Sequence, residues 1–213
     1  MFDHRLQPLL APVLDRAATA LLKPVLDRMA ARLVRAGVGA DGITLAGFAL
    51  GLAAAAAIAL QQRLAGLALM ALSRLCDGLD GAVARQTRPT DRGAFLDITL
   101  DFLFYASIPL AFALADPAAN ALAAAVLLAA FIGTGSSFLA FAALAGKRGI
   151  ASLAYPEKGL YYLGGFTEAT ETLLCFTLMC LWPQHFAPLA LGFAVLCGLT
   201  IVARLAAGWR LLD

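Results

Sequence analysis

The chain has 213 residues, of which 62% are hydrophobic and only 14% are Asp, Glu, Lys or Arg. Soluble domains carry about 25% charged residues, so this composition excludes a disordered chain and argues against a water-soluble globule. The formal net charge is +2. This charge gives no basic field for nucleic acid, and no nucleic-acid partner is expected.

Residues 1–42 are predicted to form a cytoplasmic or interfacial amphipathic segment. Apolar residues from Leu22 to Leu33 recur at steps of three and four, and charged residues fill the other face. Pro24 suits the start of this helix, because proline is favoured in the first helical turn. Such a helix next to a first span is expected to lie in the membrane interface; an ordinary surface helix has the same pattern.

The remainder, 43–213, contains six long apolar stretches, each sufficient to cross a hydrocarbon core of about 30 Å as a helix. The connections are short, so neighbouring helices are expected to run antiparallel. The sequence therefore predicts an all-α integral membrane domain with six transmembrane helices, at residues 43–60, 64–85, 93–115, 118–145, 159–181 and 186–208.

Basic residues predict the orientation of these spans, because they concentrate in cytoplasmic loops. With a cytoplasmic N-terminus, all but two of the 16 lysines and arginines fall on the cytoplasmic side. The two exceptions are Arg63, in an outer loop, and Arg74, inside a span. Both termini are therefore expected to be cytoplasmic.

Five of the fourteen acidic residues fall within residues 77–101, four of them inside predicted spans. A carboxylate in hydrocarbon costs several kcal/mol, so such residues indicate a functional site. Asp77 and Asp80 share one helix face, and Asp97 and Asp101, at i and i+4, share a face of the next helix. The turn between these helices is expected to fold them together, so that the four carboxylates converge.

A cluster of four carboxylates cannot stay ionised in a low dielectric without cations. Oxygen ligands select Mg²⁺, Mn²⁺ or Ca²⁺, and four carboxylates suit two ions. Two ions beside Arg85 would bind a pyrophosphate, and Gly81 and Gly93 leave room for phosphate or sugar near the backbone. One carboxylate would serve to deprotonate an attacking hydroxyl. The structural alternative is a set of Asp–Arg pairs that only stabilise the bundle.

The order of these residues resembles the signature of the CDP-alcohol phosphotransferase (CDP-alcohol phosphatidyltransferase) family, class I. That signature is Asp-x-x-Asp-Gly-x-x-Ala-Arg, then seven or eight residues, then Gly-x-x-x-Asp-x-x-x-Asp. The six-span layout resembles the family as well, and segments 131–138 and 161–168 resemble a single-domain bacterial inner-membrane branch. Every signature position is present here, as Asp77, Asp80, Gly81, Ala84, Arg85, Gly93, Asp97 and Asp101.

The resemblance implies transfer of a substituted phosphate, commonly the phosphatidyl group of CDP-diacylglycerol, to an alcohol in phospholipid biosynthesis, with release of CMP. It also implies a homodimer in the bacterial inner membrane with its active site on the cytoplasmic side. Two divalent ions, Mg²⁺ or Mn²⁺, would be held by Asp77, Asp80, Asp97 and Asp101, with Asp101 also the general base. The donor would contact Gly81, Arg85, Thr90, Asp41 and Thr44. Of these, Asp41 and Thr44 stand where the family has Pro-Asn-x-x-Thr, and only the threonine is kept.

Other charged residues have two interpretations each. Four basic residues expected near the cytoplasmic face are either ligands of a phosphorylated acceptor or membrane anchors: Lys147, Arg148, Lys158 and Arg204. Arg74 is at a similar depth to Glu168 and Glu171, so it is expected to pair with one of these glutamates. The alternative is that these three charges line an acceptor cavity.

Two other functions fit an acidic membrane cluster. A Mg²⁺-dependent prenyltransferase also binds pyrophosphate, but its acidic motifs are widely separated in a longer chain. A divalent-cation transporter needs intramembrane carboxylates, but it has no need for Gly81, Ala84 and Arg85 in register with them.

Overall fold

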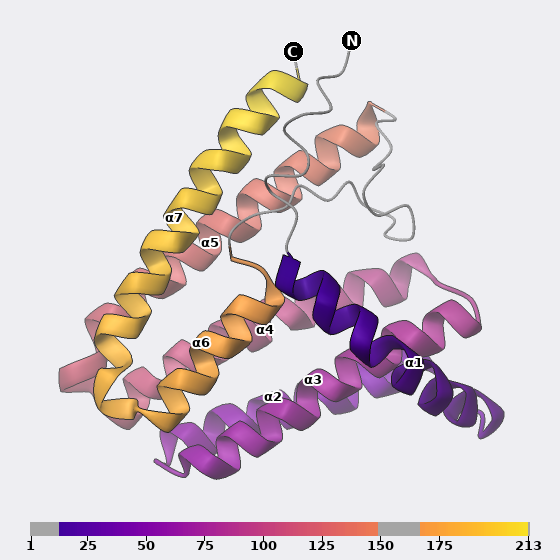
Figure 1. The fold of residues 1–213 in the computed structure, drawn as a ribbon, viewed down its shortest axis with the longest axis horizontal. Coiled ribbons are helices and arrows are strands. Elements are labelled where there is room, and N and C mark those ends of the chain that lie inside the picture. Colours follow the sequence, from indigo (N-terminus) through magenta and orange to yellow (C-terminus); the bar gives the residue numbers. More distant parts are fainter. Residues whose placement is uncertain (1–12, 149–166, 213) are drawn as a thin grey trace.

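The computed structural model describes residues 13–148 and 167–212 of the chain. Within these two ranges the regular structure is helical and there is no strand (Figure 1). The elements are α1 (Val13–Arg35), α2 (Ala40–Ala59), α3 (Arg63–Gln86), α4 (Asp91–Ala115), α5 (Pro117–Lys147), α6 (Ala169–Leu181), the short 3₁₀ helix η2 (Pro183–His185) and α7 (Phe186–Leu211).

Five helices, α2 to α5 and α7, match five of the predicted apolar stretches to within three residues at each end. Within residues 13–148 and 167–212, four segments are long and apolar enough to cross a membrane: α2, α4, α5 and the range Pro183–Leu211. Helix α3 has 24 residues but carries too many charges to count as a spanning helix by composition. The stretch predicted at 159–181 is described from residue 167, and α6 has 13 residues.

Helix α1 begins at Val13, before the predicted start, and contains Pro24 in its interior. The prediction that Pro24 starts the helix is therefore wrong. Proline disfavours the helix interior because it lacks an N–H donor, but the apolar face beyond it gains packing against α3. Ala30 is fully buried there in a small core with Leu79 and Val83.

Helix α2 packs closely on both α3 and α4. The helices on either side of the turn at 87–90 face each other as expected, and Arg74 of α3 donates a hydrogen bond to Asp101 of α4 at 2.6 Å. Small residues permit the close packing of α2. A Cβ on Gly47 would lie 2.8 Å from Cys76 Cβ, and one on Gly51 would lie 2.6 Å from Phe104 Cδ2.

The main core lies where α4, α5, α6 and α7 meet. Phe112 and Phe186 stack there with ring centroids 4.7 Å apart. Figure 1 shows the α2–α3, α4–α5 and α6–α7 connections at the same end of the molecule, and the Gln61 amide donates to the carbonyl of Ala115 at 3.1 Å. This arrangement sends the end of α3 and the start of α4 to the opposite end.

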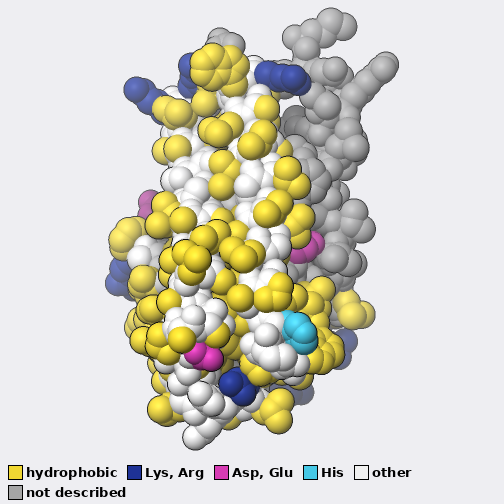
Figure 2. All heavy atoms as spheres, turned by 90° about the vertical axis from the view of Figure 1, so that its left-hand side faces the viewer, with side chains coloured by type: hydrophobic (Ala, Val, Ile, Leu, Met, Phe, Trp, Pro, Cys, Tyr) yellow, Lys and Arg dark blue, Asp and Glu magenta, His cyan; other side chains and the backbone are white. Residues whose placement is uncertain are grey.

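The outer surface of α5 and α7 is apolar. Figure 2 shows this side of the molecule covered largely by hydrophobic side chains, with few charges. Leu122 on α5 and Val195 on α7 are 79% and 65% exposed. Exposed tryptophans, Trp182 and Trp209, flank α7 at its two ends, as in the aromatic belts at membrane–water interfaces. These features are those of a multi-pass membrane protein.

Candidate active site

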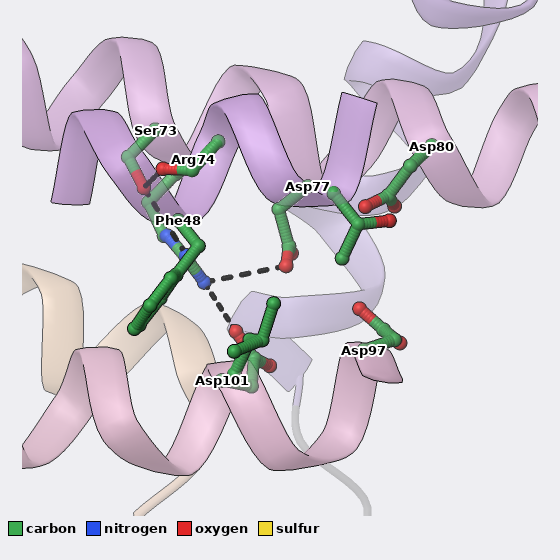
Figure 3. Close-up of a pocket in the computed structure, with 10 residues that line it drawn as sticks. Phe48, Ser73, Arg74, Asp77, Asp80, Asp97 and Asp101 are labelled. Carbon is green, nitrogen blue, oxygen red and sulfur yellow. Dashed lines mark hydrogen bonds and ion pairs between the residues drawn. The ribbon is translucent and has the colours of Figure 1, made fainter. Parts of the chain in front are cut away.

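Four aspartates from two helices line one pocket. Asp77 and Asp80 come from α3, and Asp97 and Asp101 come from α4. Figure 3 shows the two pairs on opposite walls, with their carboxylates turned toward the space between the helices. The remaining lining residues come from α2, α3 and α4: Thr44, Gly47, Phe48, Ser73, Arg74 and Leu100. The structure thus places all four signature aspartates around one space.

Arg74 lies in this pocket and contacts both aspartate pairs. Its Nη1 donates to Oδ1 of Asp101 at 2.6 Å and lies 3.4 Å from Oδ1 of Asp77 (Figure 3). The prediction that Arg74 pairs with Glu168 or Glu171 is therefore wrong. Arg74 and the two glutamates were expected at a similar depth in the membrane, but Arg74 points toward α4 and not toward α6.

The donor atoms of the pocket have the chemistry that Mg²⁺ or Mn²⁺ requires, since all four acidic side chains offer carboxylate oxygens. Asp80 is 5% exposed, and its Oδ2 is buried with no hydrogen-bond partner in the described chain. A buried carboxylate oxygen without a partner is costly and fits a cation ligand. As the side chains stand, no three acidic, His or Cys groups within 13–148 and 167–212 converge tightly enough to bind a metal. The four carboxylates nevertheless have the donor chemistry of a divalent-cation site.

The start of α4 is held by residues expected to contact the donor. Thr90 caps the helix, its Oγ1 accepting a hydrogen bond from the Gly93 amide at 3.0 Å. Asp41 at the start of α2 pairs with Arg92, its Oδ2 lying 2.5 Å from Nη2. A Cβ on Gly93 would lie 3.1 Å from Thr90 Oγ1 and 3.2 Å from Asp41 Oδ1. The absence of a side chain at Gly93 therefore lets Thr90 and Asp41 approach the start of α4, one helical turn before Asp97.

Gly81 and Arg85 lie further along α3. A Cβ on Gly81 would lie 3.2 Å from Nη1 of Arg85, so glycine leaves room for this guanidinium over the helix. Arg85 also lines a second, open pocket between α1 and the end of α3, with Lys23, Asp27, Gln86 and Pro89. The Gln86 amide donates to the carbonyl of Asp27 at 2.9 Å and fixes α1 beside this pocket.

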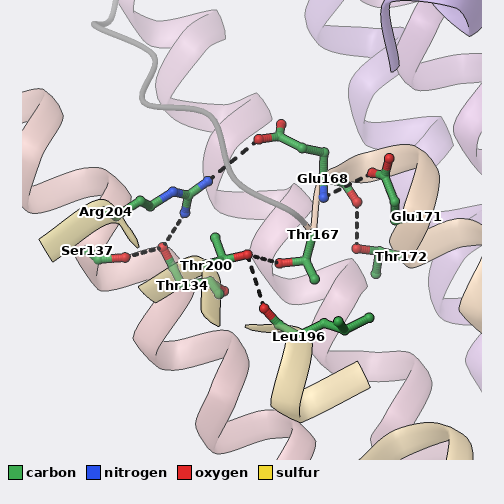
Figure 4. A network of polar contacts seen from close by, with 9 residues as sticks. All are labelled: Thr134, Ser137, Thr167, Glu168, Glu171, Thr172, Leu196, Thr200 and Arg204. Carbon is green, nitrogen blue, oxygen red and sulfur yellow. Dashed lines mark hydrogen bonds and ion pairs between the residues drawn. The ribbon is translucent and has the colours of Figure 1, made fainter. Parts of the chain in front are cut away.

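Of the residues considered for the acceptor, Lys147 and Arg204 do not line the aspartate pocket. Lys147 is exposed at the end of α5, and Lys158 lies outside the described residues. Arg204 on α7 is 7% exposed; its Nη2 lies 3.9 Å from Oε1 of Glu168, and its Nη1 donates to the carbonyl of Thr134 at 2.9 Å (Figure 4). Glu171 accepts from the Glu168 amide and completes the cap of α6.

Sequence reasoning missed four lining residues besides Arg74, namely Gly47, Phe48, Ser73 and Leu100. Arg74 had a usable signal, because it stands three residues before Asp77 and such residues share a helix face. The α2 residues had no comparable signal, since small and apolar residues occur throughout that helix.

Residues 38–204 match the CDP-alcohol phosphatidyltransferase family. Inner membrane protein YnjF of Escherichia coli is 52% identical over 209 residues, which cover 98% of this chain and 96% of that protein. Archaetidylinositol phosphate synthase of Methanothermobacter thermautotrophicus is 54% identical over 65 residues, covering 30% of this chain and 33% of that enzyme.

Crystal structures of the phosphatidylinositol phosphate synthase of Mycobacterium tuberculosis share the fold. The structure with CDP-DAG bound has a TM-score of 0.70 at 23% identity, covering 87% of this chain and 94% of that one. The structure with manganese and citrate has a TM-score of 0.67 at 24% identity, covering 86% and 88%. The family match favours a phosphotransferase over the prenyltransferase and transporter alternatives. The chain is a phosphotransferase that belongs to the CDP-alcohol phosphatidyltransferase family.

Proposed function

We propose that this protein transfers the phosphatidyl group of CDP-diacylglycerol to the hydroxyl of a small alcohol or phosphorylated alcohol, releasing CMP. This proposal rests on one observation: in a chain of this family, the same pocket is lined by Asp77, Asp80, Asp97 and Asp101. The bound CDP-DAG of the mycobacterial fold neighbour supports the choice of donor.

The four aspartates would hold two divalent ions, Mg²⁺ or Mn²⁺. The fold neighbour that was solved with manganese supports the choice of a divalent ion. When bound, these ions would neutralise the pyrophosphate and stabilise the charge that develops on departing CMP. The chain's own groups then act on the substrates. Arg85, Gly81 and Thr90 would bind the donor's nucleotide and phosphates, together with Asp41 and Thr44 at the start of α2.

Asp101 is the proposed general base. It would take the proton of the acceptor hydroxyl, and that oxygen would form a bond to the phosphorus that carries the diacylglycerol. The bond from this phosphorus to the bridging oxygen breaks, and the bridging oxygen leaves with its electron pair as part of CMP. The products are a phosphatidyl alcohol, CMP and a proton held by Asp101.

For the acceptor, we propose that a phosphate on the alcohol is drawn to Lys147, Lys158 or Arg204. The name of the archaeal relative, an archaetidylinositol phosphate synthase, supports a phosphorylated acceptor. Arg204 is the least accessible of these residues that is described, because it is held against Glu168 and the Thr134 carbonyl.

In the membrane, we propose six crossings in residues 43–213, with residues 1–42 as an interfacial segment and both termini in the cytoplasm. The pocket would then open on the cytoplasmic side, and the functional unit would be a homodimer. Single cysteines at positions 61 and 147 of a cysteine-free variant test this orientation in right-side-out vesicles. A membrane-impermeant maleimide should label position 61, and labelling at 147 instead would reverse the topology.

The reaction is tested with purified protein, Mg²⁺ or Mn²⁺, and CDP-diacylglycerol against glycerol 3-phosphate, inositol phosphate and serine. Mass spectrometry identifies the lipid product, and CMP release gives the rate. Asp101→Asn should abolish CMP release. Asp91→Asn, an exposed aspartate in the first turn of α4 that does not line the pocket, should retain it. No CMP release from any donor–acceptor pair would refute the proposal.

A further inference from the structure

Arg74 is a charged residue of the aspartate pocket that the family signature does not include. Its side chain is 14% exposed, and one nitrogen, Nη1, contacts an aspartate from each wall. Among the described residues that line the pocket, it is the only basic one. A cation in this position opposes the mutual repulsion of carboxylates in a poorly solvated site.

The guanidinium is held by groups from three helices. Its Cζ lies 3.8 Å from the centroid of the Phe104 ring on α4, within the range of a cation–π contact. Nη2 donates to Oγ of Ser73 at 3.3 Å, and this hydroxyl donates to the carbonyl of Gly47 on α2 at 2.7 Å. Gly51 lacks a Cβ where one would collide with Phe104. The Arg74 guanidinium is thus fixed by the Phe104 ring, by the Ser73 hydroxyl and by its two aspartate partners.

The fixed guanidinium of Arg74 restricts the orientation of the Asp101 carboxylate. A planar guanidinium in a fixed position orients the carboxylate to which it donates. Arg74 contacts Oδ1 of Asp101, and no such contact is made to Oδ2. The carboxylate is therefore oriented through one oxygen, and the other remains available for a proton or an ion.

We propose that Arg74 is a positioning residue for phosphatidyl transfer: its guanidinium, fixed against Phe104 and Ser73, holds Oδ1 of Asp101 so that Oδ2 receives the proton of the acceptor hydroxyl. This inference rests on the proposed function of the pocket. Arg74 contacts no reacting atom in this scheme and acts through Asp101. Its charge also weakens cation binding at the same aspartates, through repulsion over a short distance.

The test compares Arg74→Met and Arg74→Lys with Arg63→Met, a matched substitution on the same helix outside the pocket. Arg74→Met should lower kcat about 100-fold, the effect of a misplaced catalytic group, while KM for the donor and acceptor stays within about threefold. Arg74→Lys keeps the charge without the planar fork, so kcat should fall less. Arg63→Met should behave as the wild type.

Two measurements do not depend on activity. Mn²⁺ titration followed by electron paramagnetic resonance should show binding at least about tenfold tighter in Arg74→Met, because a nearby positive charge is gone. In a thermal double-mutant cycle, Arg74→Met with Asp101→Asn should lower Tm less than the two single changes together.

Faster or unchanged kcat in folded Arg74→Met, unchanged or weaker Mn²⁺ binding, or additive thermal effects would each overturn the proposal. A loss confined to KM would make Arg74 a substrate ligand and would also overturn it. If Arg74→Met does not fold, the neutral and polar Arg74→Gln carries the kinetic and Mn²⁺ comparisons. If the wild type releases no CMP, the proposed function fails, while the Mn²⁺ and thermal results still decide whether Arg74 holds Asp101.

Discussion

Glu168 and Arg204 form a buried ion pair that joins the start of α6 to α7. Their side chains are 4% and 7% exposed, with Oε1 and Nη2 3.9 Å apart. The Arg204 guanidinium also donates to the Thr134 carbonyl on α5. The pair and its carbonyl contact therefore connect α5, α6 and α7 (Figure 4).

Removing either partner of this pair should destabilise the fold. A buried charge that loses its partner costs about 3 kcal/mol or more, so Glu168→Gln and Arg204→Met should each lower Tm in detergent. The double variant should recover part of the loss, because neither charge then stays buried without the opposite one. Thermal unfolding followed by circular dichroism measures this, and additive losses would show that the pair is not coupled.

The proposed acceptor role of Arg204 has a separate signature. Arg204→Lys keeps the charge opposite Glu168, so Tm should change little. If Arg204 binds the acceptor's phosphate, KM should rise for glycerol 3-phosphate and stay constant for serine, which lacks a phosphate. If Arg204→Lys leaves the KM for glycerol 3-phosphate at its wild-type value, Arg204 is not part of the acceptor site.

Gly51→Ala should disturb the pocket without touching a charged residue. The new methyl would lie 2.6 Å from Phe104 Cδ2 and 3.1 Å from Ser73 Oγ, the two groups that support Arg74. Overpacking of this kind costs about 1–3 kcal/mol, so Tm should fall and kcat should fall with it. Gly192→Ala on α7, which has nothing within 4 Å of its Cβ position, is the control and should be neutral or slightly stabilising.

Much of the helical layout could be predicted from the sequence because apolar runs and their polar interruptions are local features. The bounds of α4, for example, are predicted by the Arg88–Asp91 turn and by Asp116-Pro117. The grouping of the aspartates was also predictable. Spacings of three and four residues place Asp77 with Asp80, and Asp97 with Asp101, on single helix faces.

The partners of individual charges could not be predicted in the same way. Depth along a helix is one coordinate, whereas pairing also needs the rotation of each helix and the identity of its neighbour. Arg74 therefore has Asp101 as its partner, and Glu168 has Arg204. The close packing of α2 on α3 and α4 depends on contacts at Gly47 and Gly51, which only three-dimensional packing reveals.

Thr90→Ala should separate the structural and substrate roles of this residue. The Thr90 hydroxyl caps α4 at Gly93, and loss of an N-cap costs about 1 kcal/mol. Thr90→Ser keeps the cap and should restore Tm. If the hydroxyl also binds the donor, Thr90→Ala should raise KM for CDP-diacylglycerol and Thr90→Ser should not. A normal donor KM in Thr90→Ala would leave capping as its only role.

Asp80→Asn should have opposite effects with and without divalent ions. Oδ2 of Asp80 is buried without a hydrogen-bond partner in the described chain, and a neutral amide is less costly to bury than a carboxylate. In EDTA, therefore, Tm should rise by about 3 °C. In Mn²⁺ the wild type should gain Tm and the variant should gain little, because one ligand is lost. Asp91→Asn should match the wild type in both conditions, and a full Mn²⁺ response in Asp80→Asn would exclude Asp80 as a ligand.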